Sequence, residues 1–408
     1  MKVNLNPVQS GAVPQPSMKK TVGVSVTVCV FVSLIVGVIG FAIGTRYQYT
    51  AAELDYSELN TVYATLKTKF DGKLDQAKLI QGAAAGMTAA AGDPYTVFLT
   101  ADDAKALTDD LAGTFEGIGA ELGTNDSGQL QIVSVLDDSP AQTAGLKSGD
   151  VIAAINDENS LAWSPDKAVG VIRGKAGTTV KLTIVRDGAS KDYSITRATV
   201  NNPSVTWEIK DGIGYMRISQ FGTDTASLAV KAANEFKNAN VKGVILDVRD
   251  DGGGYVDAAQ TVASLWLKPG TMIAQEKSGN NTVRTTVTAN GSPTLLGVPT
   301  VVLMNSGSAS ASEITAGALR DNGAAQLVGT KSYGKGSVQE IIDKDSFGRP
   351  LFKDGAVMKI TVAKWYTPKG VNINGDGLKP DVEVQMTADD YNSGKDTQRD
   401  KAVEILQK

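Results

Sequence analysis

The chain has 408 residues, which is more than one hydrophobic core usually organises, so two or three domains are expected. Apolar residues make up 42% and charged residues 21%, as in folded proteins, and a net charge of −4 gives no reason to expect a nucleic-acid partner. The chain has no histidine and one cysteine, Cys29. These counts exclude an internal disulfide, a zinc site built from Cys and His, and a Ser-His-Asp triad.

The first part of the chain predicts a membrane anchor. Residues 1–20 are polar, carry three lysines and no acidic residue, and precede an uncharged run from Thr21 to Gly44. At about 1.5 Å per residue, a helix over this run can span a hydrocarbon core of roughly 30 Å. The lysines before the run place residues 1–20 in the cytoplasm and the chain after the run outside the cell membrane. A cleaved signal peptide is the alternative, since residues 42–44 resemble a cleavage site.

The next two segments have different patterns. Residues 45–105 predict helices, because alanine is abundant and the apolar spacing is near 3.6, until Gly92-Asp93-Pro94 ends the helical pattern. Residues 106–200 contain short β runs separated by turn residues, among them "LQIVSVL", "VIAAIN" and "VKLTIVRDG". They predict a compact β-rich domain with short helical pieces near residues 141–144 and 166–172.

Strands and helices alternate from residue 201 to about residue 390. "KGVILDVRD" and "VPTVVLMN" are near-continuous apolar runs typical of buried strands, and segments such as "ASEITAGALRDNG" have helical periodicity. The alternation predicts a layered α/β domain with a mostly parallel sheet, in which we also place the strand "VMKITVAKWYT". Residues 391–408 predict an amphipathic C-terminal helix.

One turn in the α/β region has two interpretations. "NSGSASASEI", Asn305–Ile314, follows a predicted buried strand and opens a predicted helix. Ser310 and Glu313 have the spacing of a capping box, which is a structural role. Ser310 is also placed to be a nucleophile, because the free N–H groups of a first helical turn can hold a developing negative charge. Without histidine, another group must accept the serine proton.

Lys335 is the candidate for that proton acceptor. It lies in "GTKSYGKGSVQE", Gly329–Glu340, which nearly matches a phosphate-binding loop. That interpretation fits poorly, since Gly336 stands where serine or threonine would bind magnesium, and a strand pattern follows instead of a helix. A lysine between two glycines can enter a site of low dielectric, where its pKa falls and its neutral amine can act as a general base. A solvated surface lysine is the alternative.

Both segments resemble the active-site signature of the tail-specific, or carboxyl-terminal processing, serine peptidases. The Ser-Ala-Ser-Ala-Ser-Glu run at residues 308–313 and the Gly-Lys-Gly at residues 334–336 have the spacing of that signature. The resemblance implies that Ser310 is the nucleophile, that Lys335 is the base and that Gln339 orients Lys335.

A second segment, "DVRDDGGGYVDAA", is similar to the family's Asp-Leu-Arg-Asn-Asn-Pro-Gly-Gly loop. The resemblance implies an oxyanion hole made from a backbone N–H of the glycine pair Gly253 and Gly254 and from the N–H of Ala311. Gly252 stands where the family has proline, which leaves open which glycine donates. Two such donors can each lower the barrier by about 3 kcal/mol.

The β-rich domain resembles a PDZ domain, through "FEGIGAEL" at Phe115–Leu122 and "SPAQTAGLKSGDVIAAIN" at Ser139–Asn156. Successive N–H groups of a glycine loop can capture a chain-terminal carboxylate, and the peptide then adds as a strand along the adjacent edge. The resemblance implies that tails are bound by Gly117, Ile118, Gly119 and Ala120, and that Arg173 couples tail binding to the active site. An ordinary glycine turn and a solvated arginine are the alternatives.

The resemblance implies a multi-domain α/β protein with a crotonase/ClpP-like peptidase core. The expected parts are a cytoplasmic tail (1–20), a single-pass transmembrane anchor (21–44), an N-terminal helical segment (45–105), a PDZ domain (106–200), a serine peptidase core (201–390) and a C-terminal helix (391–408). We expect a membrane-anchored, extracytoplasmic endopeptidase that needs no metal or cofactor and cleaves proteins with accessible, apolar C-termini. A homo-oligomer is left open. The alternatives are a catalytically inactive PDZ-based peptide-binding protein and an acyl-transferring, crotonase-like enzyme.

Overall fold

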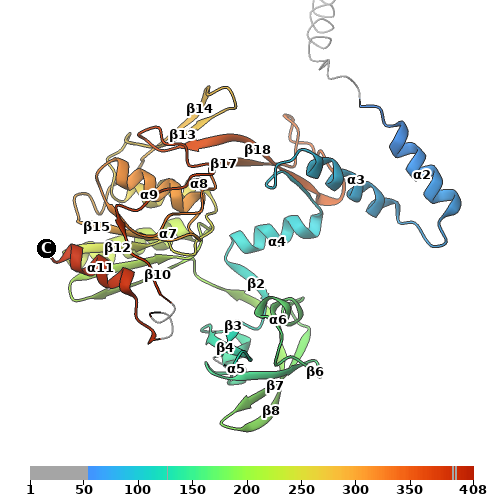
Figure 1. Ribbon diagram of the computed structural model, residues 1–408, viewed down its shortest axis with the longest axis horizontal. Coiled ribbons are helices and arrows are strands. Elements are labelled where there is room, and N and C mark those ends of the chain that lie inside the picture. The colour runs from blue at the N-terminus through green and yellow to red at the C-terminus, as the bar shows by residue number, and fades with distance from the viewer. Residues whose placement is uncertain (1–53, 126, 388–389, 391–392) are drawn as a thin grey trace, which may run out of the picture. The chain divides into compact units, whose positions relative to one another are not determined.

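The computed structural model describes residues 54–125, 127–387, 390 and 393–408, and the chain divides into two compact units. The first unit, residues 1–76, contains one described helix, α2 (Ser57–Lys69) (Figure 1). The predicted tail and anchor, residues 1–44, lie outside the described residues. Among the helices that the structure describes, none combines the length and the apolar character needed to cross a membrane.

The second unit, residues 77–408, begins with a helical segment that leads into a short strand. Its elements are α3 (Gln76–Ala90), which starts at the unit boundary, β1 (Val97–Leu99) and α4 (Ala101–Leu111). The loop between α3 and β1 is held by Asp93, whose Oδ2 accepts a hydrogen bond from Thr96 Oγ1 at 2.6 Å. Thr96 Oγ1 in turn accepts from the Thr361 N–H at 3.1 Å, which ties this loop to the later part of the chain.

The β-rich domain follows and is built around a small sheet of order β3-β4-β5-β7-β8, in which β3 is an edge strand. Alternate apolar residues of its strands, such as Ile132, Ile152 and Leu182, are fully buried and form its core. Its elements are β2 (Thr114–Gly117), β3 (Ala120–Thr124), β4 (Leu130–Val135), α5 (Pro140–Ala144), β5 (Val151–Ile155), β6 (Glu158–Asn159), α6 (Pro165–Ile172), β7 (Thr179–Arg186), β8 (Ala189–Thr196) and β9 (Ala198–Asn201).

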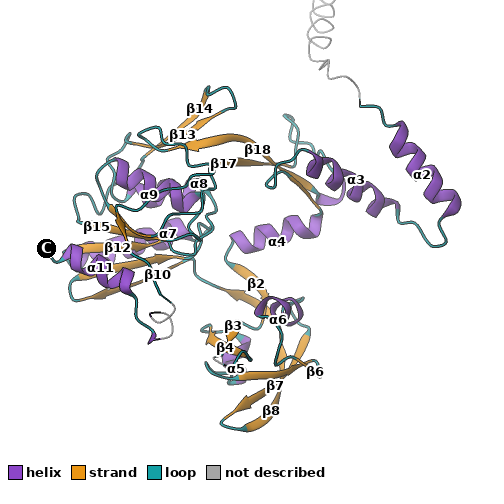
Figure 2. Ribbon diagram, viewed as in Figure 1, coloured by secondary structure: helices purple, strands orange, loops and turns teal. Residues whose placement is uncertain are grey.

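The α/β domain contains a six-stranded sheet of order β10-β11-β12-β15-β16-β19, which is parallel except for the antiparallel strand β10 at its edge. Figure 2 shows this sheet between helices. The strands and helices are β10 (Val205–Lys210), β11 (Ile213–Ile218), α7 (Thr225–Asn238), β12 (Gly243–Asp247), α8 (Val256–Ser264), β15 (Thr300–Met304), α9 (Ala311–Asp321), β16 (Gln326–Gly329), β19 (Val382–Glu383) and α11 (Thr397–Leu406).

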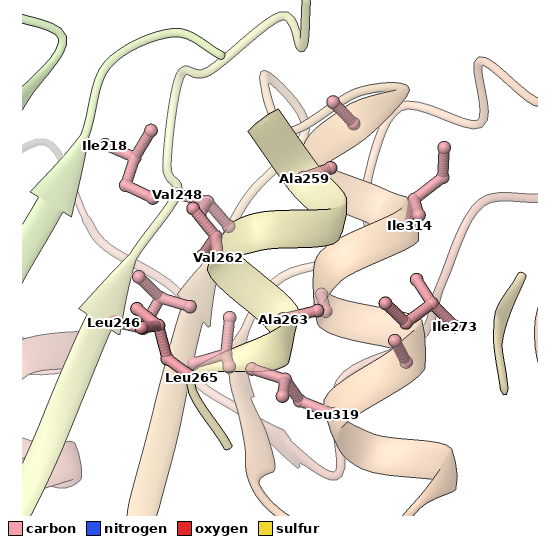
Figure 3. Close-up of a cluster of buried hydrophobic side chains, with 14 of the residues drawn as sticks. Ile218, Leu246, Val248, Ala259, Val262, Ala263, Leu265, Ile273, Ile314 and Leu319 are labelled. Carbon is pink, nitrogen blue, oxygen red and sulfur yellow. The ribbon is translucent and has the colours of Figure 1, made fainter. Parts of the chain in front are cut away.

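The apolar runs of the central strands supply both faces of the sheet, because successive side chains of a strand point to opposite sides. Leu246 and Val248 pack with α7, α8 and α9 in the main core, and Figure 3 shows them beside Val262 of α8. Ile245 points to the opposite face and lies in a smaller hydrophobic cluster with Ala402 of α11. The near-continuous hydrophobicity of "GVILD" therefore reflects burial on two sides, as expected for a central parallel strand.

A second, antiparallel sheet was not predicted from the sequence. It contains β1 and four further strands, in the order β1-β18-β13-β14 with β17 paired to β18. The four are β13 (Met272–Lys277), β14 (Val283–Thr288), β17 (Ser337–Ile342) and β18 (Val357–Tyr366), and a 3₁₀ turn, η1 (Lys353–Gly355), precedes β18. The placement of "VMKITVAKWYT" in the parallel sheet was wrong, because this segment, β18, pairs with β17 and β13 in the second sheet.

Candidate active site

Ser310 lies at the sharp turn between the buried strand β15 and helix α9. It is the N-cap of α9, with φ +56° and ψ −112°, a conformation that a non-glycine residue adopts at a cost of about 1–3 kcal/mol. Glu313 Oε2 accepts the Ser310 N–H at 2.9 Å, which is the glutamate half of the capping box predicted from the spacing. The turn follows the carboxyl end of a parallel strand, which is where α/β domains place their sites.

The three serines of the run are not equivalent. Ser308 Oγ donates to the Val248 carbonyl at 2.7 Å, and Ser312 Oγ donates to the Asp251 carbonyl at 2.9 Å. Both residues are buried, whereas Ser310 is partly exposed. The flanking hydroxyls therefore hold the turn together, and Ser310 is the serine of this run that a substrate can reach.

Lys335 is half-buried in the loop between β16 and β17. Burial lowers the pKa of Lys335, the nearby charge of Lys359 lowers it further, and Glu313 opposes both effects. A lower pKa increases the fraction of neutral amine, which is the form that can accept a proton. Lys335 Nζ lies 5.1 Å from the centroid of the Tyr95 ring, a cation–π contact that favours the charged form. Tyr95 was not predicted as a site residue, although its "DPYT" segment marks the turn that carries it.

Glu313 joins the segments that carry Ser310 and Lys335. Its Oε2 accepts the backbone N–H groups of both residues, each at 2.9 Å. Its Oε1 accepts from Ser332 Oγ at 2.5 Å and from the Gly334 N–H at 2.8 Å. Burial raises the pKa of Glu313, and these four hydrogen bonds counteract the rise. The backbones of both predicted residues therefore bond to one carboxylate. Local spacing could not reveal the bond to Lys335, because Glu313 and Lys335 are 22 positions apart in the chain.

The predicted oxyanion loop follows β12 and packs against the same turn. At Gly253, with φ +99°, an added Cβ would lie 2.7 Å from Ser310 Cβ and 3.0 Å from the Ala311 nitrogen, so only glycine fits. At Gly254, with φ +144°, it would lie 2.2 Å from the Phe221 carbonyl oxygen. At Gly252, by contrast, it would meet nothing within 4 Å.

The two glycines differ in what their N–H groups do. Gly253 donates to Asp251 Oδ1 at 2.8 Å. Within the described residues, neither the Gly254 N–H nor the Ala311 N–H has a protein acceptor. In this conformation Gly254 and Ala311 are therefore the predicted donors that remain available to an oxyanion.

Gln339 does not contact Lys335 through its amide. Its Nε2 donates to Ser337 Oγ at 2.7 Å and to Thr361 Oγ1 at 3.3 Å. The first bond lies within β17, and the second ties β17 to β18. The orienting role of Gln339 stays a prediction. Among the described residues, no group of three or more His, Cys, Asp or Glu side chains is placed to hold a metal ion.

The glycine loop of the β-rich domain lies between β2 and the free edge of β3. Ile118 is buried in the core and Gly119 has φ +78°, so residues Gly117 and Ala120 are fixed on either side of a tight turn. The carbonyls of Ile118 and Gly119 accept hydrogen bonds from Ala141 and Leu136, which leaves the N–H side of the loop for a ligand. An unpaired edge strand beside such a loop suits a peptide that adds as a further strand.

Arg173 lies at the C-terminal end of α6, with its guanidinium 5.0 Å from the centroid of the Phe115 ring. Both residues line a cavity of about 530 Å³, together with Leu122 of β3 and Val169 of α6. Leu122 and Val169 give part of this wall an apolar character. The structure places Arg173 in the lining of this cavity, and its coupling role stays a prediction.

A PDZ-like β domain beside an α/β core with a serine at a strand–helix turn defines a serine peptidase with an attached peptide-binding module. Residues 212–384 match Peptidase family S41, and residues 131–186 match the PDZ domain. The chain is 36% identical to the carboxy-terminal processing protease CtpA of Bacillus subtilis, over 81% of this chain and 69% of that protein. It is 33% identical to the "Probable CtpA-like serine protease" of Staphylococcus haemolyticus, over 86% of this chain and 71% of that protein.

Among solved structures, the photosystem II D1 C-terminal processing protease is 29% identical and superimposes with a TM-score of 0.50, over 81% of this chain and 87% of that chain. The chain belongs to peptidase family S41, in its carboxyl-terminal processing branch, and is therefore a hydrolase of the serine peptidase type. It spans about 65–71% of the length of the curated relatives named CtpA or CtpA-like that it matches.

Proposed function

We propose that this chain is an endopeptidase in which Ser310 attacks a peptide carbonyl while neutral Lys335 takes the serine proton. The attack gives a tetrahedral oxyanion and then an acyl-enzyme, and Lys335 returns the proton to the leaving amine. Lys335 then deprotonates a water molecule, which hydrolyses the ester. Gly254 and Ala311 are the N–H donors best placed to stabilise the oxyanion. The observation that carries this proposal is the Glu313 carboxylate, which binds the backbones of Ser310 and Lys335 at one oxygen.

The proposed substrates are proteins with accessible, apolar C-terminal tails. The Gly117–Gly119 loop would bind the terminal carboxylate, and the tail would extend β3 at its free edge. Leu122 and Val169 support a preference for apolar tail residues, because they line the adjoining cavity. Tail binding raises the local concentration of the cleavable segment near the peptidase domain.

We further propose that residues 21–44 anchor the protein in the cell membrane and that the peptidase acts on the extracytoplasmic side. The support is the uncharged run itself and the lysines before it. The full chain should sediment with membranes, and a chain lacking residues 1–45 should be soluble with its peptidase activity intact. Recovery of the full chain in a soluble cytoplasmic fraction would refute the anchor.

The catalytic proposal is tested with an unfolded protein substrate that carries a free apolar tail. Ser310→Ala and Lys335→Ala should each reduce kcat/KM by several orders of magnitude, because the two residues act as one unit and the removal of either disables both. Lys335→Arg should not restore activity, since arginine stays protonated. Ser308→Ala and Ser312→Ala should keep much more activity than Ser310→Ala. Cleavage that survives in Lys335→Ala would refute the dyad. If the wild-type protein binds tails but does not cleave them, the chain is a peptide-binding protein and not a peptidase.

Tail recognition is tested with the same substrate carrying an amidated C-terminus. Amidation removes the charge that the loop N–H groups would satisfy, and a charge-assisted hydrogen bond contributes roughly 1.5–3 kcal/mol. Amidation should therefore lower kcat/KM by about ten- to a hundredfold. Equal rates on the free and the amidated substrate would show that the Gly117–Gly119 loop does not read the terminus.

A further inference from the structure

Asp251 connects the glycine loop to the nucleophile turn, and the mechanism above does not use it. Its side chain is fully buried, and its Oδ1 accepts the Gly253 N–H at 2.8 Å. Its carbonyl oxygen accepts from the Ala309 N–H and from Ser312 Oγ, each at 2.9 Å. Asp251 therefore bonds to the loop through its side chain and, through its backbone, to Ala309 and Ser312 on either side of Ser310.

The second carboxyl oxygen of Asp251 is unusual. In the described part of the chain, Asp251 Oδ2 is buried and has no hydrogen-bond partner. An ionised carboxylate with one unpaired oxygen is costly to bury, so the neutral acid is the favoured form. Burial raises the pKa of Asp251 to about 7, against the lowering effects of the Gly253 N–H, Ser312 and Arg217.

The charged groups around Asp251 do not supply a direct counter-ion. Arg217, on the neighbouring strand β11, lowers the pKa of Asp251 through its charge but lies 3.7 Å from the Asp247 carboxylate. Arg249, on the same loop, is bound by Asp247 and Asp396. Asp250 is exposed and pairs with Asn305. On the α9 side, the charged residue of the first turn is Glu313, which is occupied by the four donors described above.

We propose that Asp251 is a positioning residue for the oxyanion hole and that its protonated form is the active one. The proposal rests on Ser310 being the nucleophile. When Ser310 attacks, negative charge forms on the substrate oxygen beside Ala311 and the glycine loop. An ionised Asp251 places a like charge next to it and binds the Gly253 N–H more tightly, which pulls the loop toward itself. Protonation removes the like charge and weakens that hold on the loop.

The test compares wild type, Asp251→Asn and Asp250→Asn over about pH 5 to pH 10. Asparagine has the same shape, still accepts from the Gly253 N–H and cannot ionise. Wild-type kcat should fall at alkaline pH, whereas Asp251→Asn should keep its plateau and exceed wild type by about tenfold or more near pH 9. KM should change little, because the effect is on the transition state. Asp250→Asn removes the adjacent, exposed charge and should keep the wild-type profile.

Two further variants keep the outcome decisive. Asp251→Ala removes the charge without adding an amide, and it should also lack the alkaline fall although its kcat is lower throughout. Active-site titration gives kcat per folded site, so partial unfolding does not imitate the effect. An alkaline fall that persists in both Asp251 variants, or that disappears equally in Asp250→Asn, overturns the role of Asp251. Ser310→Ala is assayed alongside: cleavage that survives in it refutes the nucleophile, whereas its inactivity leaves only the Asp251 role in question.

Discussion

Replacing Glu313 by glutamine tests whether one carboxylate aligns nucleophile and base. The carboxylate accepts four hydrogen bonds, two at each oxygen, and all four partners are donors. Glutamine has almost the same shape but only one accepting oxygen. Its NH₂ group must therefore replace one accepting oxygen, opposite either the N–H groups of Ser310 and Lys335 or the Ser332 hydroxyl and the Gly334 N–H.

The expected loss follows from the two hydrogen bonds that glutamine cannot make. A hydrogen bond to a charged group contributes about 1.5–3 kcal/mol, so the pair is worth roughly 3–6 kcal/mol. Part of this appears as lower stability and part as misalignment of Ser310 and Lys335. A displacement of about 1 Å between reacting groups can cost about a hundredfold in rate. Glu313→Gln should therefore lower kcat by at least about a hundredfold with little change in KM.

The assay measures kcat and KM for the tailed substrate, together with the free energy of unfolding by denaturant. Glu340→Gln is the matched control, because Glu340 is exposed and its ion pair with Arg284 lies on the surface. Such pairs contribute about 0–1 kcal/mol, so the control should behave as wild type. Ser332→Ala removes one of the four donors and should have an intermediate effect. A folded Glu313→Gln enzyme with wild-type kcat would refute the alignment role.

Three other predictions concern buried or shielded charges. Tyr95→Leu keeps Lys335 shielded but removes the π face, which lowers the pKa of Lys335 and should move the acidic limb of the kcat/KM profile to lower pH. Tyr95→Ala exposes the amine, which raises that pKa and should move the limb to higher pH. Equal shifts in the two variants would contradict this. Because the pKa of Asp251 is raised to about 7 in the folded protein, the unfolded chain ionises first, and wild type loses stability as pH rises from about 4 to about 7. Thermal unfolding should therefore show Asp251→Asn gaining up to roughly 4 kcal/mol over wild type across that interval, and a constant difference would contradict this. Arg249→Met leaves the buried Asp247 without its main ion-pair partner and should lower the free energy of unfolding by about 3–5 kcal/mol. A denaturant titration measures this loss, and a value below about 1 kcal/mol would contradict the prediction.

The sequence predicted the parts of the site that depend on local pattern. The strand–turn–helix around Ser310 follows from a buried apolar run and a Ser-x-x-Glu spacing, and the structure contains the buried strand and the bond from the Ser310 N–H to Glu313. The β-rich domain follows from short alternating runs with turn residues between them. The antiparallel sheet was missed because the β13–β14 hairpin is rich in polar residues and β14 is largely exposed, so its pattern does not alternate clearly. Nothing local distinguishes a strand that joins the parallel sheet from one, such as β18, that joins the second sheet.

The remaining site contacts depend on residues far apart in the chain. Glu313 has a sufficient local explanation as a capping residue, and that explanation conceals its bond to Lys335. Asp251 looks like one of several loop acids until its burial and unpaired oxygen are known. Gln339 has the expected spacing, but its amide donates to Ser337 and Thr361 and not to Lys335. Spacing specifies candidates, whereas side-chain direction is fixed by packing that a linear pattern does not contain.

The space around the three consecutive glycines determines how freely this loop can vary among related chains. A side chain at Gly253 would collide with Ser310, and one at Gly254 would collide with the Phe221 carbonyl, so neither glycine can be replaced without a shift of the backbone. Gly252 has an open surrounding and does not need a left-handed backbone, so a methyl group can be accepted there. The first glycine of the loop can therefore take a side chain without moving the turn that carries Ser310, whereas the second and third glycines cannot.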